Sequence, residues 1–318
     1  MKSWIGLTLT IFILLLSSNA IATKNAATEQ KAVLVTGATS GIGLRITEHL
    51  SQQGYFVYAG ARKDADMKRL NTIKNVQAVR LDVNKPKQIK AAVKTIEEAG
   101  RGLYGLVNNA GVVVLSPLIE TKEEDLEFLM QVNLYGPYRI TKAFAPLIIK
   151  QKGRITTISS ISGILSGRLF GPYSMSKHAI EAFSDSLAVE MAKFEVKVSV
   201  VEPGNFESKI GDSFIKRFEK NSSRKDNTLF QKEWDGMLSY FKDRKKAADP
   251  IAVAQAVEHA LFDDQPKMRY MVVPNQREGD MTLRKAMSEL VQLNQQHAHS
   301  IDREAMIRLL DEELGKLK

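Results

Sequence analysis

The feature that most constrains the fold is a regular alternation of short apolar runs with longer amphipathic stretches, beginning at Lys31. The amphipathic stretches carry apolar residues at helical spacing, as Ile42, Ile46 and Leu50 do. Strands that alternate with helices of this length need parallel crossover connections, so the pattern predicts an α/β fold with a doubly wound parallel sheet. We expect its strands at residues 32–36, 56–59, 76–81, 105–107, 154–159, 196–201 and 269–273.

The first 22 residues have the features of a targeting segment. Lys2 precedes an apolar run from Ile5 to Leu16, and Ala20-Ile21-Ala22 matches a small-x-small cleavage pattern. The run is short beside the roughly 20 residues of a membrane span, which favours a cleaved signal peptide over an uncleaved N-terminal anchor. We therefore expect an exported protein (periplasmic or in the secretory lumen) or a membrane-anchored one.

The rest of the chain predicts one domain at residues 31–275 and a helical C-terminal tail at residues 276–318. Within the domain, residues 205–249 are polar, basic and long. An insertion of this kind is typical of a lid or a substrate loop. The tail has weak apolar spacing, so we expect it to pack on the domain or on a partner chain; its apolar residues are Met306, Leu309, Leu310 and Leu314.

Composition excludes several classes of site. There is no cysteine, which rules out disulfides, thiolate nucleophiles and Cys-based metal sites. The five histidines form no zinc-type cluster, so we expect no metal. A net charge of +9 would suit an anionic partner. Its densest part, residues 216–246, lacks the regular aromatic residues of a single-strand binder, and we expect no nucleic-acid partner.

A glycine-rich loop follows the first predicted strand and opens the first helix. Its glycines are Gly37, Gly41 and Gly43, with Ser40 and Ile42 between them. Glycines allow a tight turn and close approach of backbone to a pyrophosphate, and the helix N-terminus offers free N–H groups. In this strand–loop–helix context the motif predicts the dinucleotide site of a Rossmann-type fold.

The Gly-x-x-x-Gly-x-Gly spacing resembles that of the short-chain dehydrogenase/reductase superfamily, and the resemblance extends over residues 31–275. Epimerases and dehydratases among its longer relatives usually show Thr-Gly-x-x-Gly-x-x-Gly instead. The resemblance implies a nicotinamide-dependent oxidoreductase that interconverts an alcohol and a carbonyl. It also implies further cofactor contacts at the ends of the third, fourth and sixth strands, namely Asp82, Val83, Asn109, Ala110, Gly111, Pro203, Gly204, Phe206 and Ser208.

The end of the second predicted strand bears on the choice between NAD and NADP. NAD users typically place an acidic residue there for the ribose hydroxyls. Here the position falls on Ala61, followed by Arg62 and Lys63, and no carboxylate is available at the strand end. A guanidinium suits a 2′-phosphate, so Arg62 favours NADP, while NAD remains possible.

Tyr173 and Lys177 form a Tyr-x-x-x-Lys motif. On a helix, residues four apart share a face, so the ammonium should lie near the phenol. A nearby cation favours the phenolate, and we expect it to lower the pKa of the tyrosine from its usual value near 10. Tyr173 could then act as a general base for alcohol oxidation or as a general acid for carbonyl reduction.

The resemblance adds two further catalytic positions. Ser160 lies thirteen residues before Tyr173 and is expected to stabilise developing charge on the substrate oxygen; Ser159 and Ser162 compete for this role. Asn133 matches a helix asparagine that holds a water for a proton relay through the lysine. An asparagine is mildly unfavourable inside a helix, which fits a functional role.

Residues 103–111 and 181–187 look most like the retinol and hydroxysteroid dehydrogenase branch. This implies a bulky apolar substrate, such as a steroid, a retinoid or a similar molecule, and a homodimer or homotetramer. Association with a membrane is possible through the N-terminus. The alternative is a non-catalytic dinucleotide-binding scaffold or regulatory protein, which should lack at least one of four residues. All four are present: Asn133, Ser160, Tyr173 and Lys177.

Overall fold

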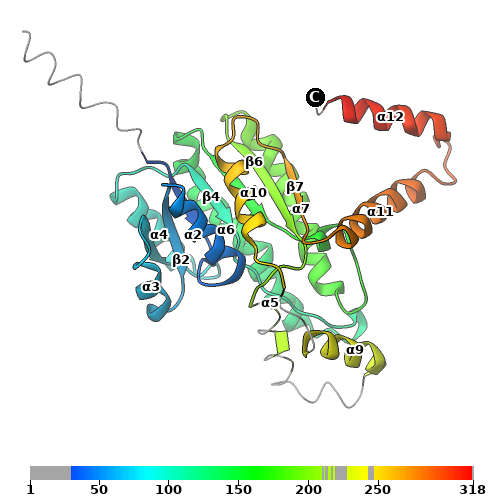
Figure 1. Ribbon diagram of the computed structural model, residues 1–318, viewed down its shortest axis with the longest axis horizontal. Coiled ribbons are helices and arrows are strands. Elements are labelled where there is room, and N and C mark those ends of the chain that lie inside the picture. Colours follow the sequence, from blue (N-terminus) through cyan, green and yellow to red (C-terminus); the bar gives the residue numbers. More distant parts are fainter. Residues whose placement is uncertain are drawn as a thin grey trace, which may run out of the picture.

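The computed structural model describes residues 30–209, 211, 214, 215, 218, 228–242 and 247–316. The described residues form a single domain around one seven-stranded sheet, in which every pairing is parallel. The strand order is β3-β2-β1-β4-β5-β6-β7 (Figure 1), which confirms the predicted doubly wound sheet. The strands are β1 (Ala32–Val35), β2 (Phe56–Ala61), β3 (Val76–Arg80), β4 (Gly105–Asn108), β5 (Arg154–Ile158), β6 (Lys197–Pro203) and β7 (Arg269–Val272).

Helices connect the strands and cover both faces of the sheet. In chain order they are α2 (Gly41–Gln52), α3 (Asp64–Leu70), α4 (Pro86–Glu98), α5 (Glu123–Asn133), α6 (Tyr135–Lys150), α7 (Gly171–Ala192), α9 (Gln231–Lys242), α10 (Ile251–Phe262), α11 (Gln276–Leu293) and α12 (Arg303–Gly315). Two short 3-10 helices, η1 (Leu118–Glu120) and η2 (Ile161–Gly163), precede α5 and α7.

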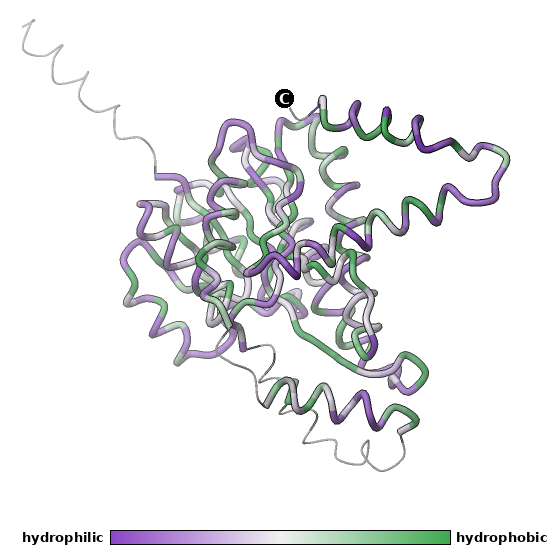
Figure 2. Tube along the Cα trace, turned by 45° about the vertical axis from the view of Figure 1, so that its right-hand side comes forward, coloured by the Kyte–Doolittle hydropathy of each residue, from purple (hydrophilic) through white to green (hydrophobic). Residues whose placement is uncertain are grey.

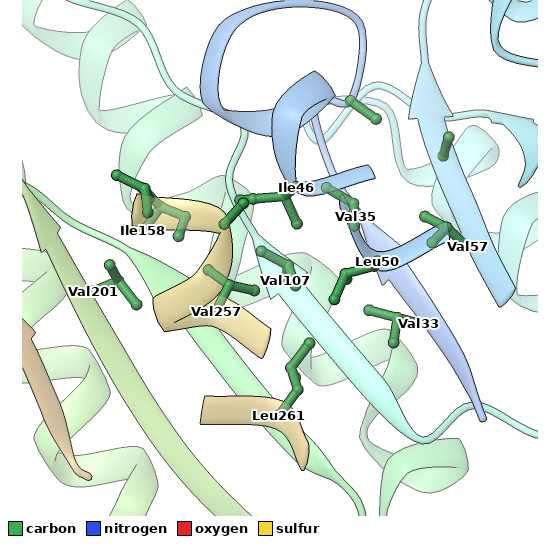
Figure 3. Packing of buried hydrophobic residues seen from close by; sticks show 14 of the residues in the cluster. Val33, Val35, Ile46, Leu50, Val57, Val107, Ile158, Val201, Val257 and Leu261 are labelled. Atoms are coloured by element: carbon green, nitrogen blue, oxygen red, sulfur yellow. The ribbon is translucent and has the colours of Figure 1, made fainter. Parts of the chain in front are cut away.

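Two apolar cores lie on opposite faces because successive side chains of a strand point to opposite sides. Val33 and Val35 pack against α2 and α10, together with Ile46, Leu50 and Val257 (Figure 3). Leu34, between the two valines, belongs to the other core, which α4, α6 and α7 cover. A strand buried on both faces reads as a continuous apolar run, as residues 32–35 do.

The order of the strands in the sheet determines where its crevice lies. From β1 the chain moves outward to β2 and β3, then returns to the other side of β1 at β4. The loops that leave β1 and β4 therefore diverge, and they open a crevice at the carboxyl ends of these strands. The loop after β1 is the glycine-rich loop of residues 36–41.

Three parts of the chain differ from the sequence expectations. The helices α3 and α10 were not predicted. Residues 205–249 were expected to form a polar loop, but the described part contains α9, and Phe214, Phe218 and Trp234 are buried together in one apolar cluster. Helical stretches were expected through residues 123–149, and they form two helices that meet at Leu134, so Asn133 is the last residue of α5 and does not lie in a helix interior. The argument from interior helix propensity was therefore wrong.

The C-terminal tail extends away from the domain as α11 and α12 (Figure 2). Gly279 and Thr282 in the first part of α11 are buried, whereas α12 contains no buried residue. Leu309, Leu310 and Leu314, which were expected to pack, are about half exposed. The predicted signal peptide or anchor, residues 1–22, lies outside the described residues. Among the described helices, none is both long and apolar enough to span a membrane.

Candidate active site

The glycine-rich loop has the shape of a cradle with no room for side chains. Gly37 and Gly41 have positive φ values of +65° and +53°, which L side chains rarely adopt. A Cβ at Gly43 would lie 2.4 Å from the carbonyl oxygen of Gly37 and 2.3 Å from Nδ2 of Asn109. The loop can therefore bring its backbone close to a ligand only while these three positions are glycine.

Hydrogen bonds hold this loop against the end of β4. The hydroxyl of Thr36 accepts from the backbone N–H groups of Asn109 and Ala110, both at 3.0 Å. The side-chain amide of Asn109 donates to the carbonyl oxygens of Thr36 at 2.8 Å and Gly37 at 3.2 Å. The loops of two neighbouring strands are thus one rigid unit. Asn109, Ala110 and Gly111 also line the crevice beside it.

A cleft of about 1380 Å³ runs from the glycine loop to Tyr173 and Lys177. Every residue predicted to contact the cofactor lines it, including those after β3 and β6. The size of the cleft and the glycine cradle fit an extended dinucleotide. Of the four predicted catalytic residues, Ser160, Tyr173 and Lys177 line the cleft.

The end of the cleft beside β2 carries charges of both signs. Arg62 and Lys63 line it, and so does Asp82, whose Oδ1 accepts from the backbone N–H of Asn84 at 3.0 Å. The helix α3 adds Asp66, a carboxylate missed when only the strand end was considered. Asp66 is partly engaged, since its Oδ1 is 3.4 Å from Nη2 of Arg69.

Tyr173 and Lys177 occupy the first two turns of α7, with Pro172 at the start of the helix. The hydroxyls of Tyr173 and Ser160 share a hydrogen bond. Ser160 also donates to the carbonyl of Pro203 at 3.4 Å and accepts from the backbone N–H of Ser162 at 3.1 Å. Of the two competing serines, Ser159 is buried, and its hydroxyl has no partner among the described residues.

The electrostatics of Tyr173 differ from the sequence expectation. Burial raises the pKa of Tyr173 to about 12, and the hydrogen bond with Ser160 acts in the opposite direction. The ammonium of Lys177 lies 5.7 Å from the centroid of the tyrosine ring and donates to the carbonyl of Ile158 at 3.0 Å. Desolvation therefore sets the direction of the shift, and the expected lowering was wrong; Tyr173 is protonated at neutral pH.

Asn133 lies behind the cleft and does not line it. Its Oδ1 accepts from the backbone N–H of Val112, and its Nδ2 donates to the carbonyl of Val112, both at 2.9 Å. The same Nδ2 donates to the hydroxyl of Ser176 at 3.0 Å. The side chain thus ties the end of α5 to the helix that carries Tyr173 and Lys177.

The far end of the cleft is apolar, which sequence reasoning missed. Leu115 and Phe170 line it from one side, and Met237 and Phe241 of α9 from the other. Behind them, Trp234 stacks on Phe214, with ring centroids 6.3 Å apart, and packs at a tilt against Phe218, with ring centroids 4.8 Å apart. The aromatic residues of the segment 205–249 carried this signal, but its high charge masked it.

The family model "short chain dehydrogenase" matches residues 31–217. The chain is 34% identical to the mitochondrial D-beta-hydroxybutyrate dehydrogenase of Mus musculus over 268 residues, covering 76% of each protein. It is 35% identical to retinol dehydrogenase 7 of the same organism over 257 residues, covering 76% of this chain and 80% of that protein.

A short-chain dehydrogenase/reductase from Burkholderia phymatum, solved in complex with NAD, shares the fold with a TM-score of 0.69. The similarity covers 86% of this chain and 98% of the other at 24% identity. The glycine cradle, the parallel sheet and the cleft that ends at Tyr173 thus occur together with extensive similarity in sequence. The chain belongs to the short-chain dehydrogenase/reductase family of oxidoreductases, in its retinol and hydroxysteroid dehydrogenase branch.

Proposed function

We propose that this oxidoreductase uses NADP(H) to interconvert an alcohol and a ketone or aldehyde on a bulky apolar substrate. The observation that carries the proposal is the arrangement at the inner end of the cleft. There the linked hydroxyls of Ser160 and Tyr173 and the ammonium of Lys177 lie between the cofactor cradle and an apolar wall.

The chain's own residues would act on the substrate oxygen. The hydroxyl of Ser160 orients this oxygen and stabilises the negative charge that develops on it. Tyr173, which burial keeps protonated, donates a proton to the oxygen when a carbonyl is reduced. Lys177 stabilises the resulting phenolate by its positive charge. When bound, the nicotinamide dinucleotide supplies the hydride in reduction and accepts it in oxidation.

The preference for NADP rests on Arg62 at the end of β2. Its guanidinium is exposed at the mouth of the cleft, where a 2′-phosphate could accept charge-assisted hydrogen bonds. Asp66 lies at the same end and would favour the free ribose hydroxyls of NAD. Arg62 and Lys63 directly follow the end of β2, whereas Asp66 is already engaged by Arg69, which supports NADP.

The preference for an apolar substrate rests on the wall formed by Leu115, Phe170, Met237 and Phe241. A pocket lined by large apolar side chains gains free energy in proportion to the apolar area that it buries. The similarity to retinol dehydrogenase 7 also supports an apolar substrate, whereas the hydroxybutyrate dehydrogenase relative acts on a small acid.

The test measures binding of NADPH and NADH to the purified full-length chain by fluorescence, followed by a screen of ketones and aldehydes. We expect tighter binding of NADPH and a reversed preference in Arg62→Asp. Arg168→Asp makes the same change of charge on an exposed arginine outside the cleft, and should leave the preference unchanged.

Tighter binding of NADH would contradict the assignment of Arg62 while leaving the oxidoreductase reaction intact. The non-catalytic scaffold differs in another way, because it would bind a dinucleotide yet turn over no alcohol or carbonyl. Binding of neither dinucleotide would contradict both alternatives.

A further inference from the structure

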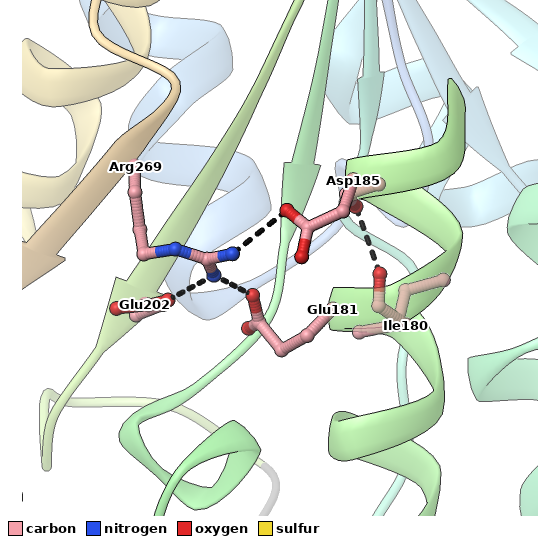
Figure 4. Close-up of polar contacts among 6 residues, drawn as sticks. Ile180, Glu181, Asp185, Glu202 and Arg269 are labelled. Atoms are coloured by element: carbon pink, nitrogen blue, oxygen red, sulfur yellow. Dashed lines mark hydrogen bonds and ion pairs between the residues drawn. The ribbon is translucent and has the colours of Figure 1, made fainter. Parts of the chain in front are cut away.

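A cluster of charged side chains lies one helical turn behind Lys177, outside the cleft. Glu181 and Asp185 follow Lys177 on α7 at four-residue spacing, Glu202 is near the end of β6, and Arg269 begins β7 (Figure 4). The side chains of Glu181 and Glu202 are only 10% and 1% exposed. Buried carboxylates cost free energy unless they are paired, so the cluster requires an explanation.

Arg269 binds all three carboxylates. Its Nη1 donates to Oε1 of Glu202 at 2.7 Å and also to Oε2 of Glu181, while Nη2 donates to Oδ1 of Asp185 at 2.8 Å. One guanidinium balances one negative charge, and Asp185 is half exposed to solvent. Glu181 and Glu202 therefore share a single cation in the buried part of the cluster.

A buried carboxylate that shares a cation with a second carboxylate favours its own protonated form, and here this applies to Glu202. The side chains of Glu181 and Glu202 are within hydrogen-bonding reach of each other, and burial raises the pKa of Glu202. Oε1 of Glu181 is buried without a partner among the described residues. A Cβ at Gly163 in η2 would lie 2.7 Å from this oxygen, so the glycine provides space for the carboxylate.

The cluster acts on Lys177 through Glu181. Burial lowers the pKa of Lys177 to about 8, and the charge of Glu181 opposes this effect. The other ionisable groups around the pair are Tyr173 and Asp185 on α7, Glu202 on β6 and Arg269 on β7; η2 contributes none. The hydrogen bond from Lys177 to the carbonyl of Ile158 orients the ammonium without adding a charge.

We propose that Glu181 is a positioning residue whose carboxylate, held by Arg269 and Glu202, keeps Lys177 positively charged during the reaction. The inference rests on the proposed alcohol–carbonyl reaction, in which the charge on Lys177 acts through Tyr173. Glu202 also directly precedes Pro203, whose carbonyl accepts from Ser160. The cluster thus adjoins both α7, which carries Tyr173 and Lys177, and the backbone carbonyl that Ser160 binds.

The test compares the full-length wild type with Glu181→Gln and Asp185→Asn. Gln is nearly isosteric with Glu, and its amide can donate to Glu202, so we expect this variant to fold. We expect the pH at which reduction of 4-nitrobenzaldehyde by NADPH declines to fall by about one unit in Glu181→Gln. Asp185→Asn also removes a carboxylate from Arg269, one turn further from Lys177, and should leave this pH unchanged.

A second measurement does not depend on turnover. Lys177 lines the cleft, so its reactivity toward acetic anhydride, followed against pH by mass spectrometry, reports its pKa directly. We expect a lower pKa in Glu181→Gln and an intermediate one in Glu181→Asp, which keeps the charge but withdraws it by one methylene. The aspartate variant supplies the comparison should Glu181→Gln fail to fold.

An unchanged pKa of Lys177 in both variants of Glu181, in an active enzyme, would overturn this proposal and leave the proposed function intact. A lowered pKa of Lys177 in a protein that reduces no aldehyde or ketone would contradict the proposed function. It would still support the electrostatic role of Glu181. Equal shifts in Glu181→Gln and Asp185→Asn would also overturn it, since the effect would then belong to Arg269 in general.

Discussion

The two ends of the cleft are built in different ways. At the cofactor end the ligand-facing surface is largely backbone, held by hydrogen bonds between residues 36–37 and 109–110. At the substrate end it consists of side chains from three separate stretches, around Leu115, Phe170 and α9. A backbone surface tolerates almost no substitution, whereas a side-chain surface can change its shape one residue at a time. The comparison suggests a shared cofactor site beside a substrate site open to variation.

We expect the largest loss of activity from a substitution where the cofactor end and the substrate end of the cleft meet. Replacing Tyr173 with Phe removes the proton donor, so turnover should fall by about 10²–10⁴-fold while dinucleotide binding persists. Steady-state kinetics and fluorescence titration would measure the two properties separately. Tyr138→Phe, on the exposed side of α6, is the matched control and should behave as wild type. Comparable turnover in the two variants would remove Tyr173 from the reaction.

A substitution at the cofactor end should have the next largest effect. Gly43→Ala places a methyl group 2.4 Å from the carbonyl of Gly37, so the loop must shift. We expect dinucleotide affinity to fall by at least about tenfold, equivalent to about 1.4 kcal/mol. Gly167→Ala adds the same methyl group at the substrate side of the cleft, where no described atom lies within 4 Å. Equal affinities would show that the loop is less rigid than its contacts indicate.

A substitution at the substrate end should weaken substrate binding without changing dinucleotide binding. Trp234→Ala removes the ring that supports Phe214 and Phe218 beneath the apolar wall. We expect a several-fold rise in KM for apolar substrates and an unchanged affinity for the dinucleotide. A loss of dinucleotide affinity would mean that the two ends are coupled.

The smallest effect concerns α9 itself. Gly236 lies in the middle of this helix, and no described atom is within 4 Å of a Cβ built there. Gly236→Ala should therefore raise stability by at most about 1 kcal/mol, because glycine is a poor helix former. Thermal unfolding would measure the gain, and the affinity for NADPH should stay constant. A destabilised variant would indicate that the wall is packed more closely than its contacts suggest.

The sequence predicted some parts of the site better than others. The strand–glycine–helix motif and the Tyr-x-x-x-Lys spacing are local patterns, and their residues come together in the cleft as expected. Asn133 was placed by resemblance and by an argument from helix propensity, and in the structure its side chain ties the end of α5 to α7. Asp66 was missed because only the strand end was considered, whereas α3 folds back to the same edge.

The sequence by itself determined the parallel sheet, the cofactor loop and the helical pair, since each depends on residues within a few positions of one another. Only the tertiary structure decided the pKa of Tyr173, the apolar wall and the cluster around Arg269. Desolvation depends on every atom that surrounds a group, and Arg269 meets Glu181 across 88 residues of chain. Contacts of that kind leave no periodic signal, because the elements that make them are brought together only when the sheet is complete.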